Sequence, residues 1–284
     1  AEYWPLELYK LTLAPAEKEL ARRVVLVTGA ARGIGAAIAR RLAAEGAHVL
    51  LTDINEERAT AVATGIEQKE GAGRAAAVSL DVTDETSVAA AFEKLRLTYG
   101  GLDILISNAG VAIVAPLDTL ELDDWQRSLA VNATGHFLVA REAMRIFKEQ
   151  RTGGSMVFVA TKNVPAPGKD FGAYSVAKAA EAQLARVLAI EGGEFGVRVN
   201  MINPDAVFED SGLWSDELKE MRAASYGIEA DGLEGYYQQR NLLKARVTPD
   251  DVAQAALWLA SDRSSKTTGA MIPVDGGLRE AFPR

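Results

Sequence analysis

The pattern of apolar and polar positions alternates between two periods along most of the chain. Apolar residues recur at helical spacing over 36–45, 56–69, 84–98, 123–148, 174–191 and 249–261. Short apolar runs between them, rich in β-branched residues, predict strands over 24–27, 48–52, 75–80, 103–107, 154–160, 197–202 and 270–274. Strands that alternate with helices in this way form a parallel sheet covered by helices on both faces. We therefore expect a single α/β domain, doubly wound around seven parallel strands.

Two segments depart from this alternation. Residues 1–22 form an arm whose apolar side chains, beginning at Trp4, must pack on another surface, and Pro15 precedes a short charged helix. Residues 206–245 follow the sixth strand and predict short helices. A long excursion at the carboxyl edge of a parallel sheet, where ligands bind, predicts a substrate lid. We divide the chain into the arm and one domain at 23–284 that includes this lid.

The lid contains four aromatic residues that are candidates for substrate specificity. Each can instead pack a small core of the lid itself, which for any one of them is the simpler interpretation. The four residues are Trp214, Tyr226, Tyr236 and Tyr237.

Composition narrows the classes of function. The 284 residues, 48% of them hydrophobic, are enough to bury one large core. A net charge of −8 without a long basic block argues against nucleic acid and against an anionic membrane as partners, and no apolar run approaches the ~18 residues of a membrane span. The chain has no cysteine, and His48 and His136 match no metal-ligand spacing. We expect a cytoplasmic protein that uses no metal and acts on a small-molecule substrate.

A glycine-rich turn joins the first predicted strand to the first helix of the domain. Gly29, Gly33 and Gly35 lie directly after the strand, in the spacing G-x-x-x-G-x-G. Without side chains at these positions, a pyrophosphate can approach the backbone and the helix N-terminus. The alternative is a tight turn that binds no ligand. The position of the turn after the first strand favours a dinucleotide site.

Asp53 ends the second predicted strand, 18 residues after Gly35. A carboxylate there accepts hydrogen bonds from the adenosine ribose and repels a 2′-phosphate, which favours NAD over NADP. Arg32 lies inside the glycine turn and can meet a 2′-phosphate, but we expect the carboxylate to dominate. Asp81 and Val82 close the third strand and can flank the adenine, although Asp81 equally suits a turn or a helix cap.

Tyr174 and Lys178 are candidates for proton chemistry. They lie four positions apart in a predicted helix, so that the phenol and the ammonium share one face. Such a pair alone is also common on solvated helix surfaces. The ordinary pKa of a tyrosine is near ~10, and the ammonium of Lys178 together with the positive charge of a nicotinamide would lower it toward the range in which the phenol acts as an acid or a base.

Taken together and in order, these motifs resemble the short-chain dehydrogenase/reductase family. The resemblance extends from Arg23 to Gly277 and rests on 28–35, 107–110, Asn132, 174–178 and 274–277. It implies a Rossmann fold and an NAD(P)-dependent oxidoreductase. It also implies that Lys178 holds the nicotinamide ribose and that Asn132 holds a water beside Lys178.

The resemblance implies two sets of site residues. The catalytic set is Asn132, Thr161, Tyr174 and Lys178, in which Thr161 orients the substrate oxygen. Asn108, Ala109 and Gly110 shape the floor of the cofactor site. The complete cofactor-binding set is Gly29, Arg32, Gly33, Ile34, Gly35, Asp53, Asp81, Val82, Asn108, Ala109, Gly110, Tyr174, Lys178, Pro204 and Val207.

Two positions depart from the pattern of the family. Thr161 stands where the family has a serine; it keeps the hydroxyl but adds a methyl group that restricts its rotamers. Asp205 follows Pro204 where the family usually has glycine, and the next residues lack the usual threonine that binds the carboxamide. We expect backbone groups of Val207, or Ser211, to substitute there.

Three phrases resemble a narrower group, the dehydrogenase half of bifunctional rhamnulose-1-phosphate aldolase/alcohol dehydrogenases. They are residues 2–10, 203–207 and 264–284. This resemblance implies that the arm is a linker from an aldolase domain and that the substrate is L-lactaldehyde, formed in rhamnose catabolism. The alternatives are an NADP-dependent reductase of a larger ketone or sugar, and a non-catalytic NAD-binding module. The family resemblance further implies a homodimer or homotetramer that pairs through helices near 123–148 and 173–191.

Overall fold

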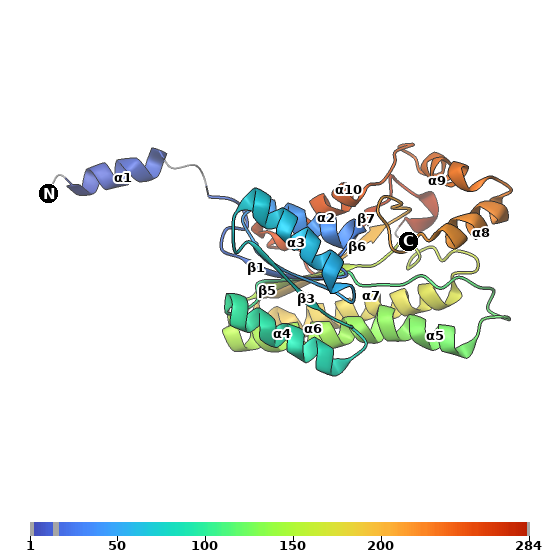
Figure 1. The fold of residues 1–284 in the computed structure, drawn as a ribbon, viewed down its shortest axis with the longest axis horizontal. Helices are drawn as coiled ribbons and strands as arrows, with labels where there is room; N and C mark the ends of the chain where they lie inside the picture. The colour runs from blue at the N-terminus through green and yellow to red at the C-terminus, as the bar shows by residue number, and fades with distance from the viewer. Residues whose placement is uncertain (1–2, 14–16, 283–284) are drawn as a thin grey trace.

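The structure, a computed structural model, describes residues 3–13 and 17–282 and contains one seven-stranded parallel sheet (Figure 1). The strand order is β3-β2-β1-β4-β5-β6-β7, so the order reverses beside β1. Such a reversal opens a crevice at the carboxyl ends of the strands. The predicted fold class is confirmed. The strands are β1 (Val24–Thr28), β2 (His48–Asp53), β3 (Ala75–Ser79), β4 (Ile104–Ser107), β5 (Gly154–Val159), β6 (Val197–Pro204) and β7 (Met271–Val274).

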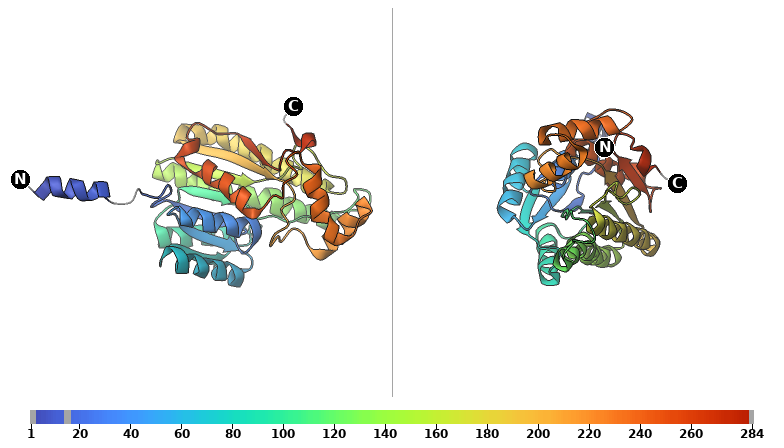
Figure 2. Two further views of the ribbon diagram at one scale, coloured as in Figure 1. Left: turned by 90° about the horizontal axis from the view of Figure 1, so that it is seen from above. Right: turned by 90° about the vertical axis from the view of Figure 1, so that its right-hand side faces the viewer.

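Helices cover both faces of the sheet (Figures 1 and 2). One layer consists of α2 (Gly33–Ala44), α3 (Glu56–Glu70) and α10 (Pro249–Ala260). The other consists of α4 (Glu85–Tyr99), α6 (His136–Gln150) and α7 (Gly172–Gly192). Short 3-10 turns follow some of these elements, at η2 (Gly193–Phe195), η4 (Asp262–Ser264) and η5 (Arg279–Ala281).

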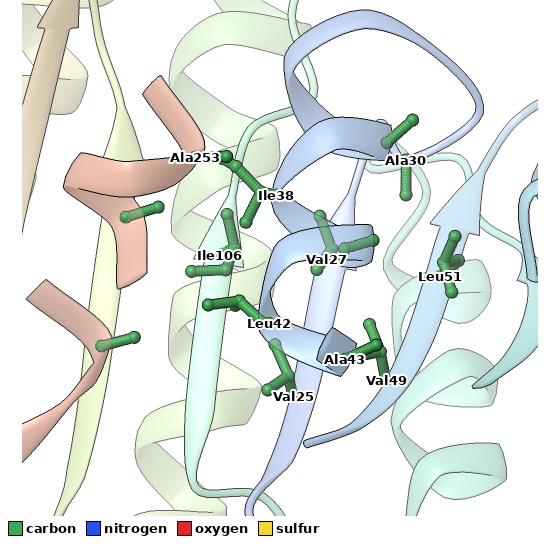
Figure 3. Close-up of a cluster of buried hydrophobic side chains, with 14 of the residues drawn as sticks. Val25, Val27, Ala30, Ile38, Leu42, Ala43, Val49, Leu51, Ile106 and Ala253 are labelled. Carbon is green, nitrogen blue, oxygen red and sulfur yellow. The ribbon is translucent and has the colours of Figure 1, made fainter. Parts of the chain in front are cut away.

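Successive residues of β1 point to opposite faces of the sheet. Val25 and Val27 pack with Ile38 and Leu42 of α2 in one cluster of buried side chains (Figure 3). Leu26 belongs to the cluster on the other face. Because helices cover both faces, the strand is a continuous apolar run rather than an alternation of apolar and polar residues.

The register of the sheet brings the polar ends of the strands to one edge. Thr28 of β1 pairs with Thr52 of β2, directly before Asp53. Ser107, at the end of β4, pairs with Phe158 near the end of β5. The residues that follow these strands therefore share the same edge of the sheet, as the alternating pattern predicts.

The helix expected over 123–148 contains one wider turn. α5 (Leu122–Leu129), the π-helical segment η1 (Ala130–Gly135) and α6 follow one another without a break. Asn132 lies in this wider turn and is fully buried. π turns are rare and occur frequently at functional sites.

The segment expected as a lid forms two short helices, α8 (Asp216–Tyr226) and α9 (Leu233–Arg240), and the 3-10 turn η3 (Ala230–Gly232). Its aromatic residues pack together: the rings of Phe208 and Trp214 stack at 4.3 Å, and those of Tyr226 and Tyr236 at 4.4 Å. Trp214, Tyr226 and Tyr237 belong to a small core of the lid and also line the cleft described below, whereas Tyr236 is 37% exposed.

The arm differs from its prediction. Residues 3–13 form α1 (Tyr3–Leu13), which lies apart from the sheet and its helices (Figures 1 and 2). Trp4 is 69% exposed, so the expected packing of the apolar arm is wrong for the residues described. Residues 17–22 form a turn rather than a charged helix, and only Leu20 among them reaches the core. Pro15 lies outside the described residues.

The position of Leu42 in the core predicts its contribution to stability. Leu42→Ala should lower the free energy of unfolding by ~2–5 kcal/mol, because it removes fully buried methyl groups and leaves a cavity. Leu97→Ala, on the exposed side of α4, should change it by less than ~0.5 kcal/mol. Urea unfolding measures both, and equal losses would contradict the assignment of α2 to the core.

Candidate active site

A cleft of about 800 Å³ opens at the carboxyl edge of the sheet. Residues of the turns after β1, β2, β4, β5 and β6 line it, together with the first turns of α7 and parts of the lid. All of the cofactor-binding residues expected from the sequence lie along its walls. Of the catalytic set, Thr161, Tyr174 and Lys178 line the cleft, whereas Asn132 lies behind it.

The glycine turn packs closely against the end of β4. Gly29 has a φ of +64°, and a Cβ atom there would lie 2.9 Å from Cα of Ala109. A Cβ atom on Gly35 would lie 2.2 Å from the carbonyl oxygen of Gly29. Asn108 donates from Nδ2 to the carbonyl oxygens of Thr28, at 2.9 Å, and Gly29, at 3.0 Å. The turn therefore needs glycine at positions 29 and 35, and Asn108 joins it to the end of β4.

The lid contacts the glycine turn through Asp210. The backbone N–H of Gly33, at the N-terminus of α2, donates to Oδ2 of Asp210 at 3.2 Å. Oδ1 of Asp210 lies 3.5 Å from Nη2 of Arg58 on α3. A helix N-terminus favours anions, and here the chain supplies the anion itself. The sequence analysis missed Asp210, since it lies 177 residues from Gly33.

Asp53 is fixed by backbone donors. Its Oδ2 accepts from the N–H of Ala31 at 3.0 Å, and its Oδ1 accepts from the N–H of Asn55 at 2.9 Å. The carboxylate is thereby held beside the glycine turn. Arg32 is exposed, and its guanidinium lies against Gly212 of the lid.

Asp81 forms a turn. Its Oδ1 accepts from the N–H of Thr83 at 2.9 Å and from the hydroxyl of Thr83 at 2.7 Å. The cap of α4 is Asp84, whose side chain accepts from the N–H of Thr86. Of the two structural interpretations of Asp81, the turn is correct, and the residue also lines the cleft beside Val82.

Tyr174 and Lys178 lie in the first turns of α7 and are both buried. Nζ of Lys178 donates to the carbonyl oxygen of Val159, at the end of β5, at 3.0 Å. Burial raises the pKa of Tyr174, while the charge of Lys178 and a hydrogen bond from Thr161 lower it. Lys178 acts in the predicted direction, but burial outweighs it, so the net lowering expected from the sequence is not achieved by the chain's own groups.

Thr161 and Asn132 lie on either side of this pair. Thr161 directly follows β5, and its Oγ1 accepts from the N–H of Asn163 at 3.3 Å. Asn132 donates to the carbonyl oxygen of Val111 at 2.9 Å and accepts from its N–H at 3.0 Å. A Cβ atom on Gly110 would lie 3.0 Å from Oδ1 of Asn132, so only glycine fits without displacing it.

Lys178 also belongs to a buried polar cluster that the sequence analysis missed. Its Nζ lies 2.7 Å from Oε2 of Glu181, and the same oxygen lies 3.6 Å from Nε2 of His136. Nδ1 of His136 lies 2.6 Å from Oγ of Ser107. Glu181 is 0% exposed. The signal was present in the sequence as a glutamate three positions after Lys178 in an otherwise Ala-rich helix.

Burial controls protonation in this cluster. It raises the pKa of Glu181 to about 7, although the charge of Lys178 acts in the opposite direction. Burial and the charge of Lys178 lower the pKa of His136 well below its usual value. Neither carboxylate oxygen of Glu181 has an aligned hydrogen bond within the described chain, so the short approach to Lys178 acts through charge.

Neither a group of metal-ligating side chains nor a membrane-spanning helix occurs in the residues described. Within 3–13 and 17–282, no group of three or more His, Asp or Glu side chains is arranged to hold a metal ion. In the same ranges, every helix is too short or too polar to cross a membrane.

Comparison with known proteins identifies the family. A family model described as enoyl-(acyl carrier protein) reductase matches residues 29–279. The crystal structure of a short-chain type dehydrogenase/reductase from Mycobacterium marinum is similar, with a TM-score of 0.81 and 28% identity over 93% of this chain and 98% of that one. The chain belongs to the short-chain dehydrogenase/reductase family. Members of this family are oxidoreductases that bind a nicotinamide cofactor and act on hydroxy or carbonyl compounds.

Two relatives show how far this similarity extends. The uncharacterized oxidoreductase YuxG of Bacillus subtilis is 53% identical over 283 residues, which are 100% of this chain but 41% of that protein. The D-threitol dehydrogenase of Mycolicibacterium smegmatis is 37% identical over 258 residues, which are 90% of this chain and 92% of that one. The chain thus spans less than half the length of YuxG.

The burial of Glu181 predicts a pH-dependent stability. Because the pKa of Glu181 rises from 4.5 to about 7 on folding, its contribution to the free energy of unfolding is complete below pH 4.5 and is lost as the pH rises through 7. Relative to Glu181→Gln, the wild type should lose up to ~3 kcal/mol between pH 4.5 and pH 8. Urea unfolding across this range measures the difference.

Glu220→Gln, at an exposed position of α8, is the matched control and should show no such trend. A difference between wild type and Glu181→Gln that stays constant with pH would contradict the assignment.

Proposed function

We propose that the protein is an NAD-dependent oxidoreductase that transfers hydride between the nicotinamide and a small hydroxy or carbonyl compound. The observation that carries this proposal is the meeting of Tyr174, Lys178 and Thr161 in the cleft that also contains the glycine turn and Asp53. The cofactor supplies or accepts the hydride when bound. The chain supplies binding groups, orientation and the proton.

The residues of the cleft fit a dinucleotide. The N–H of Gly33 points from the N-terminus of α2 toward an anion, since it already donates to Asp210, and a pyrophosphate would take the place of that carboxylate. The absence of side chains at Gly29 and Gly35 allows close approach. Asp53 is held by two backbone donors and retains lone pairs for ribose hydroxyls, which supports NAD over NADP.

Tyr174 is the acid or base in this proposal. Its raised pKa keeps the phenol protonated near neutral pH, ready to donate to a carbonyl oxygen in the direction of reduction. In the direction of oxidation the phenol needs the charge of Lys178 and the further positive charge of oxidised nicotinamide to act as a base. Thr161 orients the substrate oxygen. The side-chain amide of Asn132 donates to the carbonyl oxygen of Val111 and to the hydroxyl of Ser128. A water beside Lys178 would therefore be held by the main-chain carbonyl of Asn132.

L-lactaldehyde is the substrate we propose within this class. The support is the resemblance of residues 203–207 and 264–284 to dehydrogenases that are fused to rhamnulose-1-phosphate aldolase, together with the greater length of YuxG. A fused aldolase domain is part of the same proposal. Without cysteine, no thiohemiacetal can form, so oxidation of the aldehyde would start from its hydrate, with Tyr174 taking a hydroxyl proton.

We also propose a homodimer or homotetramer. Exposed apolar side chains lie along the helices that the family resemblance assigns to pairing. They are Leu122 on α5, Phe137 on α6, and Val176, Val187 and Ile190 on α7.

Removal of the phenolic hydroxyl group of Tyr174 tests the proposed activity. Wild-type protein should reduce or oxidise L-lactaldehyde with NAD(H), and Tyr174→Phe should lower kcat by ~10²–10⁴, because it removes the proton donor while keeping the ring. Tyr236→Phe, on α9 of the lid, should retain activity. Spectrophotometric assay of NADH gives both rates. Binding of NAD without turnover of any hydroxy or carbonyl compound would instead support a non-catalytic module.

Asp53 provides a test of cofactor choice. Asp53→Asn should reduce the preference for NAD over NADP, measured as a ratio of kcat/KM, by about tenfold or more, since repulsion of the 2′-phosphate is lost. Asp84→Asn alters only the cap of α4 and should leave that ratio unchanged. A wild-type protein that prefers NADP would contradict the assigned role of Asp53.

A further inference from the structure

Three cationic side chains from separate elements meet at the substrate end of the cleft. Lys162 directly follows Thr161, Arg222 lies on α8, and Arg240 ends α9. All three line the cleft. We call them the cationic cluster, and the hydride transfer proposed above uses none of them.

The cationic cluster is only partly neutralised. Nη2 of Arg240 lies 3.5 Å from Oδ2 of Asp205. Within the described ranges, neither Lys162 nor Arg222 forms an ion pair with a carboxylate. Burial raises the pKa of Asp205 and lowers that of Lys162, as expected in a poorly solvated place, while the charges of Lys162 and Arg240 act to lower the pKa of Asp205.

Arg222 is held rigidly and has an unused donor. It is only 6% exposed, and its guanidinium lies over the rings of Phe171, at 5.2 Å, and Tyr226, at 4.9 Å. Nη1 donates to the carbonyl oxygen of Lys169 at 3.4 Å, and Nη2 donates to the hydroxyl of Tyr226. Nε is buried and has no partner in the described chain. A buried charge without a counter-ion is costly, which indicates that a ligand completes the site.

The cluster is close to the reacting group but separate from it. The ring of Phe171 lies 6.1 Å from that of Tyr174 and directly under Arg222, so one aromatic ring separates Arg222 from the phenol. Lys162 donates to the carbonyl oxygen of Ala166 at 3.2 Å, which leaves further ammonium protons for a ligand. Because Tyr174 and Thr161 take the reacting oxygen in the function proposed above, a group bound by the cationic cluster is a different one.

We propose that the cationic cluster binds an oxyanion, a carboxylate or a phosphate, that the substrate carries on a carbon other than the reacting one. The inference rests on the proposed hydride transfer and narrows its substrate class to small hydroxy or carbonyl compounds with such a group. L-lactaldehyde has no oxyanion, so this inference ranks it below such compounds in kcat/KM and replaces it as the preferred substrate.

Matched pairs of alcohols test this preference and its source. The carboxylate arm compares 3-hydroxybutyrate with 2-butanol, and the phosphate arm compares glycerol 3-phosphate with 1,2-propanediol, each with NAD. At least one anionic compound should exceed its neutral partner by about tenfold or more in kcat/KM. Arg222→Met and Lys162→Met should each reduce this ratio toward one, mainly through KM. Lys94→Met, which removes an exposed cation of α4 that does not line the cleft, should preserve it.

A binding measurement separates this inference from the proposed function. Inorganic phosphate or acetate, at constant ionic strength and with saturating NAD to fill the glycine turn, should raise the Tm of wild type and of Lys94→Met. Arg222→Met should lose this effect, and Arg222→Lys should recover part of it. This pattern supports the cationic cluster even if no compound is turned over, whereas the lack of any NAD-dependent turnover counts against the proposed function.

Two results would overturn the inference. One is equal or faster turnover of the neutral partner in both pairs. The other is stabilisation by phosphate and acetate that Arg222→Met and Lys162→Met both retain, which would place the anion elsewhere.

Discussion

The buried ammonium of Lys178 joins parts of the site that come from distant segments. A charged group with 2% exposure needs partners on every side. β5 supplies the carbonyl oxygen of Val159, α7 supplies Glu181, and Gly110 after β4 lies close enough that a Cβ atom there would be 3.7 Å from Nζ. The sheet, the π turn and α7 are thus arranged around one charge. When Glu181 is protonated, the positive charge of Lys178 is not neutralised, and when Glu181 is ionised, its negative charge offsets that of Lys178. The pKa of Tyr174 therefore depends on a carboxyl group that does not line the cleft.

The parts of this arrangement that the sequence predicts are those that depend on local periodicity and chain order. Glycines after a first strand and an aspartate after the second must meet, because parallel strands end at one edge, and Gly35 and Asp53 do so. The π turn at Asn132 was not predictable from spacing, since one extra residue in a turn hardly alters the apolar pattern. The role of Asp210 depends on a contact between the lid and the glycine turn, which no local pattern encodes. Glu181 lies at a local i,i+3 spacing from Lys178, and only its approach to His136 of α6 joins separate elements.

The local charge at the substrate end of the cleft could likewise not be predicted from the composition of the chain. A net charge of −8 describes the whole surface and conceals a local excess of cations built by Lys162, Arg222 and Arg240. Asp205, which departs from the family pattern, lies beside Arg240 and partly balances that excess. The aromatic core of the lid fixes where the two arginines lie, because both guanidinium groups stack on its tyrosines. The packing of the lid therefore also fixes the positions of the two arginines of the proposed anion site.

The contact between Asp210 and Gly33 makes occupation of the glycine turn an exchange of one anion for another. On the proposed function, the free energy of cofactor binding would be a difference between two similar interactions, since a pyrophosphate at Gly33 would replace the carboxylate of Asp210. Asp210 also lies 3.5 Å from Arg58 of α3, so this one lid carboxylate joins the lid to two helices at the glycine-turn end of the cleft.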